Sequence, residues 1–322
     1  MRTPRSVAIR MFLVGAIALG ADVACGQSFP NKPVRMIAAE VGGASDLVVR
    51  VIAPGLSENL GQPIIVDNRG GSGVIPIELT VKAPADGYTL LIFGGALWLL
   101  PYIQDVSYEP LRDIAPVAMT TVSPGIVVVH PSLPVKSIKE FIALAKAQPG
   151  KLNYASGISG SVTHLPAELF KAMAGVNIVR VTYKGAAPAL NAIMGGEVQV
   201  MFASGVTAAP HIKSGRMRAL AVTSAQPSAF FPGVPTVAAE GLPGYEAAST
   251  QGIFAPANTP ATVIRRLNAE IIKALYKKDV KERFLNTGYE VVDYTPEQFT
   301  AWIKTDMARM GKVIKDAGIR AE

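Results

Sequence analysis

Strand-like and helix-like segments alternate along most of this chain, and the alternation is the feature that most limits its possible folds. Val34–Ala39 is predicted as a buried strand, and Asp46–Asn59 as a helix with its apolar side chains on one face. A strand at Ile64–Asp67, a short helix ending near Lys82 and a strand at Thr89–Phe93 follow. Such a βαβαβ series predicts a mostly parallel sheet covered by helices.

A second series of the same kind begins after Gly125–His130, so the pattern predicts two α/β lobes. The chain length of 322 residues also exceeds what one hydrophobic core usually serves. Helices at Pro260–Lys277 and Pro296–Ile314 are predicted from apolar periodicity and a proline at each start. The elements of the second series are helix Ser137–Ala147, strand Leu152–Ser156, helix Thr163–Ala174, strand Ile178–Thr182, helix Ala187–Met194 and strand Val198–Ala203.

The amino terminus has the composition of a secretory signal peptide. Three arginines flank the start of an apolar run at Met11–Ala21, and small residues at Ala24 and Gly26 follow. We expect residues 1–26 to be removed, because the run is shorter than the roughly 18 residues that span a membrane. Cys25 is the only cysteine, and its position leaves lipid anchoring as an alternative. In either case no disulfide is expected in the mature chain.

The charge balance is mildly basic. The full chain carries a formal charge of +7, and residues 1–26 hold three arginines and one aspartate, so +5 remains without them. The basic residues are scattered, and no basic helix with interleaved aromatic residues is present, so nucleic acid is not an expected partner. A modest positive charge suits the capture of acidic solutes.

Sequence patterns of catalytic and cofactor sites are missing. His130, His164 and His211 are far apart, without the spacing of metal ligands. No nucleophile elbow or phosphate-binding loop occurs, and the glycines at 70–73 do not fit a dinucleotide fingerprint. We therefore expect no metal, no cofactor and no enzyme activity. A catalytic triad assembled from distant residues stays open as an alternative.

The segment Lys151–Ala174 combines a strand, a Gly/Ser-rich turn and a helix start. The first N–H groups of a helix lack backbone acceptors and lie at the positive end of its dipole, so they attract a carboxylate. Hydroxyls in and beside the turn add donors. The alternative is that Thr163 or Ser161 simply caps the helix. Because ligands of open α/β sheets bind beyond the carboxyl ends of the strands, we expect the loops after the following residues to face one cleft: Ala39, Asp67, Ser156, Thr182 and Ala203.

Nine short segments occur in an order that is typical of one receptor family. They are FPNKPVRMI at 29–37, GGASD at 42–46, LGQPIIVDNRGGSG at 60–73, ADGYTLL at 85–91, KAQPGKLNYAS at 146–156, THLPAELFK at 163–171, YKGAAPAL at 183–190, GRMRALAVTS at 215–224 and VPTVAAEGLPGYE at 234–246. From Phe29 onward the chain thus resembles the solute-binding receptors of tripartite tricarboxylate transporters, the Bug family. The resemblance implies a type II periplasmic-binding-protein fold, α/β, with one lobe from 28–125 with 249–322, the other from 126–248, and a ligand cleft between them.

The resemblance also implies the function. It indicates a monomeric, non-catalytic periplasmic protein that captures a small organic carboxylate and delivers it to the permease subunits of a tripartite transporter. In the family, main-chain amides and hydroxyls hold the carboxylate, partly through water, without an arginine. Two alternatives remain open: a sensor that signals to a membrane kinase, and an exported hydrolase. Closure is expected as a hinge motion near Gly125–Val129 and Thr250–Ala255.

Carried over by position, the resemblance implies a set of ligand-binding residues on both lobes. Asp46 could instead cap its own helix, and His164 could be a packed structural residue. Glu40 stands where relatives usually have an aromatic residue; facing the cleft it would disfavour a second carboxylate, and facing solvent it would have no effect. The implied set is Gly42, Gly43, Ala44, Ser45, Asp46, Asn68, Ser156, Gly157, Ser159, Gly160, Ser161, Thr163, His164, Gly185, Ala186, Ala203 and Ser204.

Overall fold

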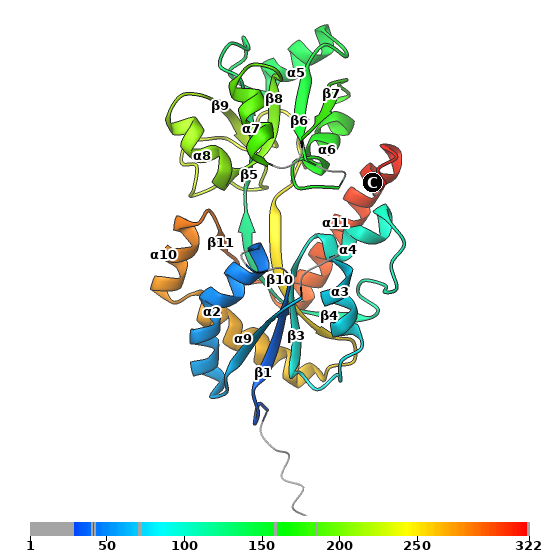
Figure 1. The fold of residues 1–322 in the computed structure, drawn as a ribbon, viewed down its shortest axis with the longest axis vertical. Coiled ribbons are helices and arrows are strands. Elements are labelled where there is room, and N and C mark those ends of the chain that lie inside the picture. The colour runs from blue at the N-terminus through cyan, green and yellow to red at the C-terminus, as the bar shows by residue number, and fades with distance from the viewer. Residues whose placement is uncertain are drawn as a thin grey trace, which may run out of the picture.

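Two β-sheets flanked by helices organise the chain into two lobes (Figure 1). The computed structural model describes residues 29–39, 41, 43–69, 73–157, 160–183 and 186–320. The first lobe contains β1 (Val34–Ala38), α2 (Ala44–Leu60), β2 (Ile64–Asn68), α3 (Val74–Val81), β3 (Thr89–Gly94), α4 (Ala96–Ile103), β4 (Ile114–Ser123), β10 (Ser249–Pro256), α9 (Ala261–Leu275), α10 (Lys278–Asn286), β11 (Glu290–Val291) and α11 (Pro296–Asp316). The second contains β5 (Gly125–Val129), α5 (Ile138–Ala147), β6 (Asn153–Ser156), α6 (Leu165–Ala174), β7 (Val179–Thr182), α7 (Ala186–Met194), β8 (Val200–Ser204), α8 (Gly205–Lys213) and β9 (Arg218–Val222).

The predicted alternation is confirmed, since every helix and strand expected from the two series is present with ends shifted by at most a few residues. The helices that the prediction lacks are α4, α8 and α10. Helix α4 reads ALWLLPYI, so it is apolar on all sides and shows no helical periodicity. Helix α8 contains Pro210, a residue that normally argues against a helix interior.

In each sheet one antiparallel strand is inserted between strands that run in one direction, and in the first sheet the edge strand β11 is also antiparallel to its neighbour β4. The order is β11-β4-β10-β3-β1-β2 in the first sheet and β7-β6-β8-β5-β9 in the second. Strands β1, β2 and β3 pair in parallel, as do β6, β7 and β8. Strand β10 pairs antiparallel with β3 and β4, and β5 with β8 and β9. The inserted strands are the first that the chain forms after each crossing between lobes, so they enter the sheet from the opposite end.

The two crossing segments run side by side. The outgoing chain leaves β4 at Ser123, and Ser123 is the register partner of Ser249, where the returning chain begins β10. On the second lobe, the Thr223 N–H donates to the Gly125 carbonyl (2.9 Å), and the Ala247 N–H donates to the Thr223 carbonyl (2.8 Å). Both crossings are thus tied at both ends into ordered sheet structure.

The two segments near which a hinge is expected lie within the sheets, directly beside the crossings. Gly125–Val129 is strand β5, paired along its length with β8, and Thr250–Ala255 lies inside β10, paired with β3 and β4. Neither segment crosses between lobes, because sheet pairing starts immediately after each crossing. The residues between the sheets are Pro124 on the outgoing chain and the stretch before Ser249 on the returning one.

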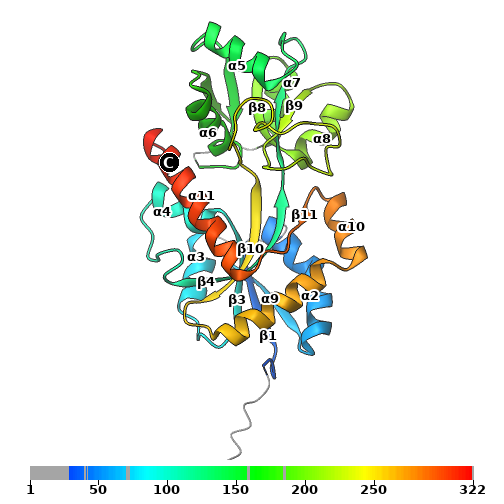
Figure 2. The ribbon, with the colours of Figure 1, turned by 180° about the vertical axis from the view of Figure 1, so that it is seen from behind.

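Helix α11 forms a third connection. It packs on β4 and α4 of the first lobe and extends to α6 of the second (Figure 2). Within this helix, Arg309 donates to Asp306 Oδ1 (2.8 Å), and its Nη1 lies 3.3 Å from Glu246 Oε2 on the returning chain. Asp306 Oδ2 accepts from Trp98 Nε1 of α4 (2.8 Å). The network joins α4, α11 and the returning chain.

The hydrophobic cores follow the layers of the fold. One core lies between the first sheet and helices α2 and α9, and includes Val48, Ile52 and Leu267. On the other face of that sheet, Trp98 of α4 meets the rings of Phe254 and Phe299 at centroid distances of 6.3 Å each. None of the helices in the described ranges is both long enough and apolar enough to span a bilayer.

Candidate functional site

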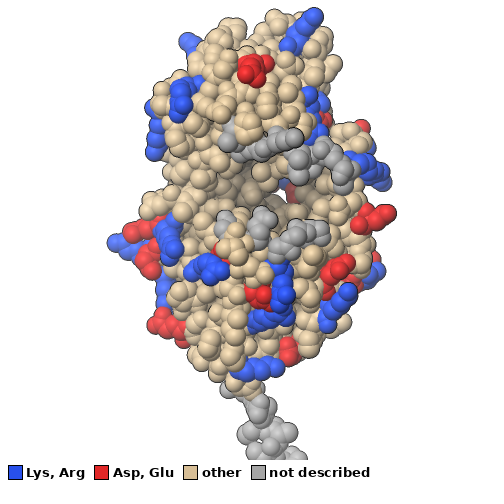
Figure 3. Space-filling view, viewed as in Figure 1, with Lys and Arg blue, Asp and Glu red and all other residues tan. Residues whose placement is uncertain are grey.

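The carboxyl ends of the parallel strands in the two sheets face each other across the crossing segments. On the first lobe, Gly94 ends β3 and pairs with Gln251, near the start of β10, where the chain has just arrived from the second lobe. On the second lobe, Ser204 ends β8 and pairs with Gly125, where the chain has just arrived from the first. The molecular surface is hollowed between these edges (Figure 3). Open α/β sheets bind ligands at such edges.

The turn after β6 is folded by its own polar groups. Thr163 Oγ1 accepts from the Gly157 N–H (2.8 Å) and lies 3.2 Å from Ser161 Oγ. Gly160 has φ +77°, the left-handed region that glycine adopts without strain. The N-cap of α6 is His164, without a side-chain capping bond, and its first amides donate to the Ser161 carbonyl. Helix capping by the Thr163 or Ser161 hydroxyl is therefore wrong: these hydroxyls shape the turn.

Consecutive amides at this turn lack protein partners. The backbone N–H groups of Ser161, Val162 and Thr163 have no hydrogen-bond acceptor in the described part of the chain. They directly precede α6, a ten-residue helix whose dipole is positive at this end. Val162 is exposed, with 62% of its surface accessible. The turn thus combines free backbone donors with hydroxyls at the cleft edge.

His164 is engaged by protein groups at both ring nitrogens. Its side chain is buried, Nδ1 accepts from the Gly160 N–H (3.1 Å), and Nε2 lies 3.8 Å from Glu168 Oε1. Glu168 also accepts from the Tyr154 hydroxyl (2.5 Å) and from Lys171 Nζ (2.8 Å). Burial, and secondarily the bond to Glu168, raises the pKa of Tyr154. For His164 the geometry favours the structural alternative, in which the ring holds the turn in place.

Arg180 of β7 is a candidate site residue that was not predicted from the sequence. Its Nε donates to Ser156 Oγ (2.8 Å), and its Nη2 donates to the Gly157 carbonyl (2.8 Å). A guanidinium therefore lies directly beside the turn, bonded to protein atoms. The available signal was an arginine in the middle of the four-residue strand Val179–Thr182, where it is partly buried.

On the first lobe, Asp46 and Asn68 belong to one network at the start of α2. Asp46 is 3% exposed, and its Oδ1 accepts from Arg50 Nε (2.8 Å) and from Asn68 Nδ2 (2.9 Å). Asn68 also accepts from Arg50 Nη2 (3.0 Å) and lies 3.3 Å from the Ala39 carbonyl. The network fixes the ends of β1 and β2 to α2. The N-cap of α2 is Gly43, so Asp46 stands in the first turn as an acidic residue favoured by the dipole.

Ser45 reaches across the sheet end to β10. It is buried, and its hydroxyl donates to Gln251 Oε1 over 2.8 Å. Gly43 and Ala44 start the same helix turn. This contact joins residues 206 positions apart in the sequence.

The remaining predicted positions are scattered around the same edges. Ala203 is buried within β8, Ser204 ends that strand, and Ala186 is the first residue of α7. The signal-peptide prediction for residues 1–26 lies outside the described residues. So do Glu40, Gly42, Ser159 and Gly185.

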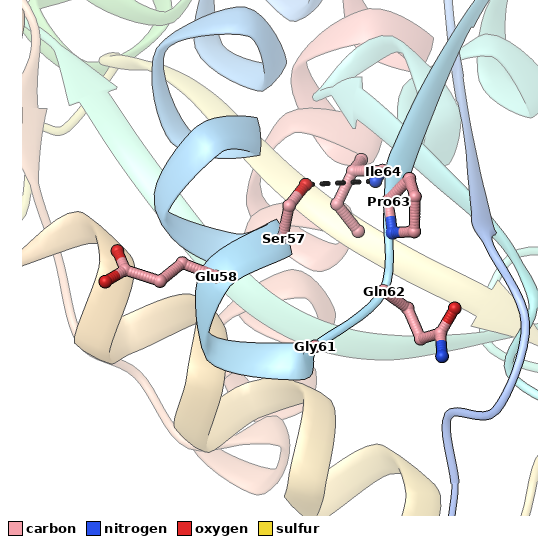
Figure 4. A pocket seen from close by; sticks show the side chains of 6 residues that line it. All are labelled: Ser57, Glu58, Gly61, Gln62, Pro63 and Ile64. Atoms are coloured by element: carbon pink, nitrogen blue, oxygen red, sulfur yellow. Dashed lines mark hydrogen bonds between the residues drawn. The ribbon is translucent and has the colours of Figure 1, made fainter.

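A surface depression outside the cleft lacks converging polar groups. It lies where α2 ends and β2 begins, roughly 20 Å along the helix from Ser45. There, Glu58 and Gln62 point away from each other, and the Ser57 hydroxyl accepts from the Ile64 N–H (Figure 4). Within the described ranges, no three His, Cys, Asp or Glu side chains gather closely enough to hold a metal ion.

Comparisons with known proteins agree with this architecture. The profile of the tripartite tricarboxylate transporter family receptors matches residues 48–319. Protein BugT of Bordetella pertussis is 35% identical over 325 residues, which cover 99% of each chain. The structure of R. palustris Rpa4515 with adipate is 35% identical, with a TM-score of 0.71, covering 90% of this chain and 99% of that one. MatC from Rhodopseudomonas palustris with bound malate is 29% identical, with a TM-score of 0.67, covering 89% and 100%.

The expected fold class is confirmed by these structures together with the two sheets described above. The fold is that of type II periplasmic-binding proteins, with two α/β lobes joined by paired crossing segments. The match of the family profile covers most of the chain, and a relative aligns with almost all of it. This chain belongs to the tripartite tricarboxylate transporter receptors of the Bug family.

Proposed function

We propose that this protein captures a small organic carboxylate between its lobes and delivers it to the permease of a tripartite transporter, without chemical turnover. The observation that carries the proposal is the run of N–H groups at Ser161, Val162 and Thr163, which have no acceptor among the described residues, on the cleft-facing edge of the second lobe. The relatives solved with adipate and malate support the ligand class. The family is one of periplasmic receptors, and we propose that residues 1–26 direct export and are removed.

The ligand contacts are proposed to come from the positions carried over from the family. The lobes would comprise 28–125 with 249–322, and 126–248. Helix-start amides and hydroxyls supply charge-assisted hydrogen bonds worth roughly 1.5–3 kcal/mol each. About four or five of them, less the cost of ordering, reach the ~8 kcal/mol of micromolar binding. The proposed contacts are Gly42, Gly43, Ala44, Ser45, Asp46, Asn68, Ser156, Gly157, Ser159, Gly160, Ser161, Thr163, Gly185, Ala186, Ala203 and Ser204, and His164 of the same set acts by holding the turn in place.

The experiment is calorimetric titration of the purified protein with adipate, malate, citrate and benzoate. At a hundredfold excess over Kd, a bound acid stabilises the protein by about 2.7 kcal/mol, so melting curves provide a second reading. Thr163→Val keeps the shape of the side chain but removes the hydroxyl that accepts from Gly157. We expect it to weaken binding by about tenfold.

Thr305→Val on helix α11 is the matched control, because that hydroxyl is exposed and bonds only to the Ala301 carbonyl of its own helix. A wild-type protein that binds no organic acid, or that returns the acid chemically altered, would contradict the proposal. Capture of permease subunits from solubilised membranes by the acid-loaded protein would test delivery.

A further inference from the structure

Gln251 places a side-chain amide at the end of β3, on the cleft-facing edge of the first lobe. The residue is 6% exposed and is the register partner of Gly94, the last residue of β3. Its Oε1 is occupied by the Ser45 hydroxyl (2.8 Å). This bond fixes the orientation of the amide. The two N–H groups of Nε2 are then left for other acceptors. Neither has an acceptor among the residues that the structure describes.

The end of β3 is shaped to hold this amide. A Cβ at position 94 would lie 2.8 Å from Gln251 Nε2 and 2.9 Å from the Thr250 carbonyl. Real Cβ atoms do not approach other atoms so closely, so a side chain at position 94 would displace the amide. Gly94 therefore makes room for the Gln251 side chain to lie across the strand end.

A second unsatisfied polar group lies next to it. Thr121 of β4 is the register partner of Gln251 on the other side of β10, and cross-strand partners have neighbouring side chains on one face. Within the described ranges, Thr121 Oγ1 is one of three fully buried side-chain polar atoms without a partner; the others are on Glu270 and Arg309. Gln251 Nε2 is not among these enclosed atoms, so it keeps some solvent contact. Buried donors without acceptors are costly and usually mark an absent partner.

The charges nearby are already compensated. Asp46, next to Ser45, is bonded to Arg50 and Asn68. The cleft-facing edge of the first lobe thus offers neutral N–H donors. The second lobe, in contrast, has the charged side chain of Arg180 beside the turn before α6. A ligand carboxylate is better placed at the second lobe, and an acceptor at its other end would meet Gln251.

We infer that Gln251 is a specificity-determining residue, whose Nε2 donates to a second acceptor group of the ligand. The inference rests on the proposed function, in which a first carboxylate binds at the α6 turn. It assigns as ligands organic acids that carry a second carboxylate, hydroxyl or carboxamide. Ser45 is a positioning residue, because its hydroxyl sets the orientation of the amide.

The test compares ligands that differ in the second group alone: adipate with hexanoate, and succinate with butyrate. Wild-type protein should bind the diacid of at least one pair at least tenfold more tightly than its monoacid. Gln251→Leu, similar in size but without N–H groups, should remove this preference through weaker diacid binding, with the monoacid unchanged. Gln251→Glu should weaken diacid binding further through repulsion between carboxylates. Ser45→Ala should reduce the preference in part.

Gln148→Leu is the matched control, because Gln148 is exposed at the end of α5. Circular dichroism and melting curves show whether each variant is folded. The inference is overturned if folded Gln251→Leu keeps the wild-type preference, if it loses both ligands of a pair equally, or if wild-type protein has no preference. If the wild-type protein binds none of these four acids and none of malate, citrate and benzoate, the proposed function fails as well. If it binds acids but shows no dependence on Gln251, only the inference about Gln251 fails.

Discussion

The guanidinium of Arg180 donates to the hydroxyl of Ser156 over 2.8 Å, which places a positive charge beside the turn that leads into α6. The two residues are 24 positions apart and belong to adjacent parallel strands. Arg180 donates hydrogen bonds to protein atoms of the turn and therefore orders it. Its charge also makes the electrostatic potential at the turn more positive. The expectation of an anion site without a nearby cation is therefore incomplete.

Replacing this charge should weaken acid binding. For Arg180→Met we expect a loss of about tenfold, or ~1.4 kcal/mol, because the turn loses at least the bonds to Ser156 and Gly157 and a nearby charge. Since salt screens charge interactions, the loss should be larger at low ionic strength than at 0.5 M salt. Calorimetric titration with adipate at both salt concentrations measures it. Arg283→Met, at an exposed site on α10, should bind as wild type; equal losses in both variants would show that net charge alone matters.

Asp46 should stabilise the first lobe through its network. Asp46→Ala removes the acceptor of both Arg50 and Asn68, and we expect the free energy of unfolding to fall by about 1–3 kcal/mol. Urea unfolding followed by circular dichroism measures this change. Glu282→Ala, at an exposed site on α10, should change stability by less than about 0.5 kcal/mol. If Asp46→Ala leaves the free energy of unfolding unchanged, the network does not stabilise the first lobe.

The start of α8 should tolerate no side chain. A Cβ on Gly205 would lie 2.6 Å from the Pro124 carbonyl and 2.7 Å from the Phe231 ring, so Gly205→Ala must displace the crossing chain. We expect a loss of at least ~2 kcal/mol in unfolding free energy. In Gly55→Ala, inside α2, the new methyl meets Lys277 atoms at 3.5 Å, and we expect a gain of about 0.5–1 kcal/mol. Melting temperatures that shift equally would contradict this difference.

Acid should destabilise the protein in part through Asp67. Burial opposes its ionisation, yet hydrogen bonds from Arg69 and Arg35 hold the pKa of Asp67 below its usual value. Because the folded-state pKa is lower than the unfolded one, the contribution is present above about pH 4 and disappears as pH falls through the folded-state value. Asp67→Asn should therefore be less stable at pH 7 and lose less stability toward pH 3. Urea unfolding across this range checks it, with Glu282→Gln expected to follow the wild-type curve.

The sequence predicted the elements of the fold better than their connections. Strand and helix periodicity identified both βαβ series, because these patterns depend on neighbours a few residues apart. Periodicity failed for α4, whose eight residues are nearly all apolar, and for α8, which contains Pro210. The expected crossing segments proved to be sheet strands, because Gly125 and Ser249 pair with Ser204 and Ser123, which are distant in sequence within the same lobe.

The part of the candidate site that consists of residues close in sequence could be predicted. The part that depends on contacts between distant segments could not. The Gly/Ser-rich turn before α6 can be recognised in the sequence, because its glycines and hydroxyl residues fall within nine residues. Gln251 gave no signal, and Arg180 gave only that of an arginine inside a short strand, since each contacts a segment that is distant in sequence. Their partners, Ser156 and Ser45, come close through strand pairing and through the start of α2 against β10.

The sequence by itself determined the alternating elements, the two lobes and the donor-rich turn, because hydrophobic period, glycine content and helix starts are local properties of the chain. The tertiary structure decided which strand enters each sheet in reverse, and which polar side chains meet at the cleft. Those outcomes depend on register and packing between residues as far apart as Ser45 and Gln251, and no local pattern encodes them.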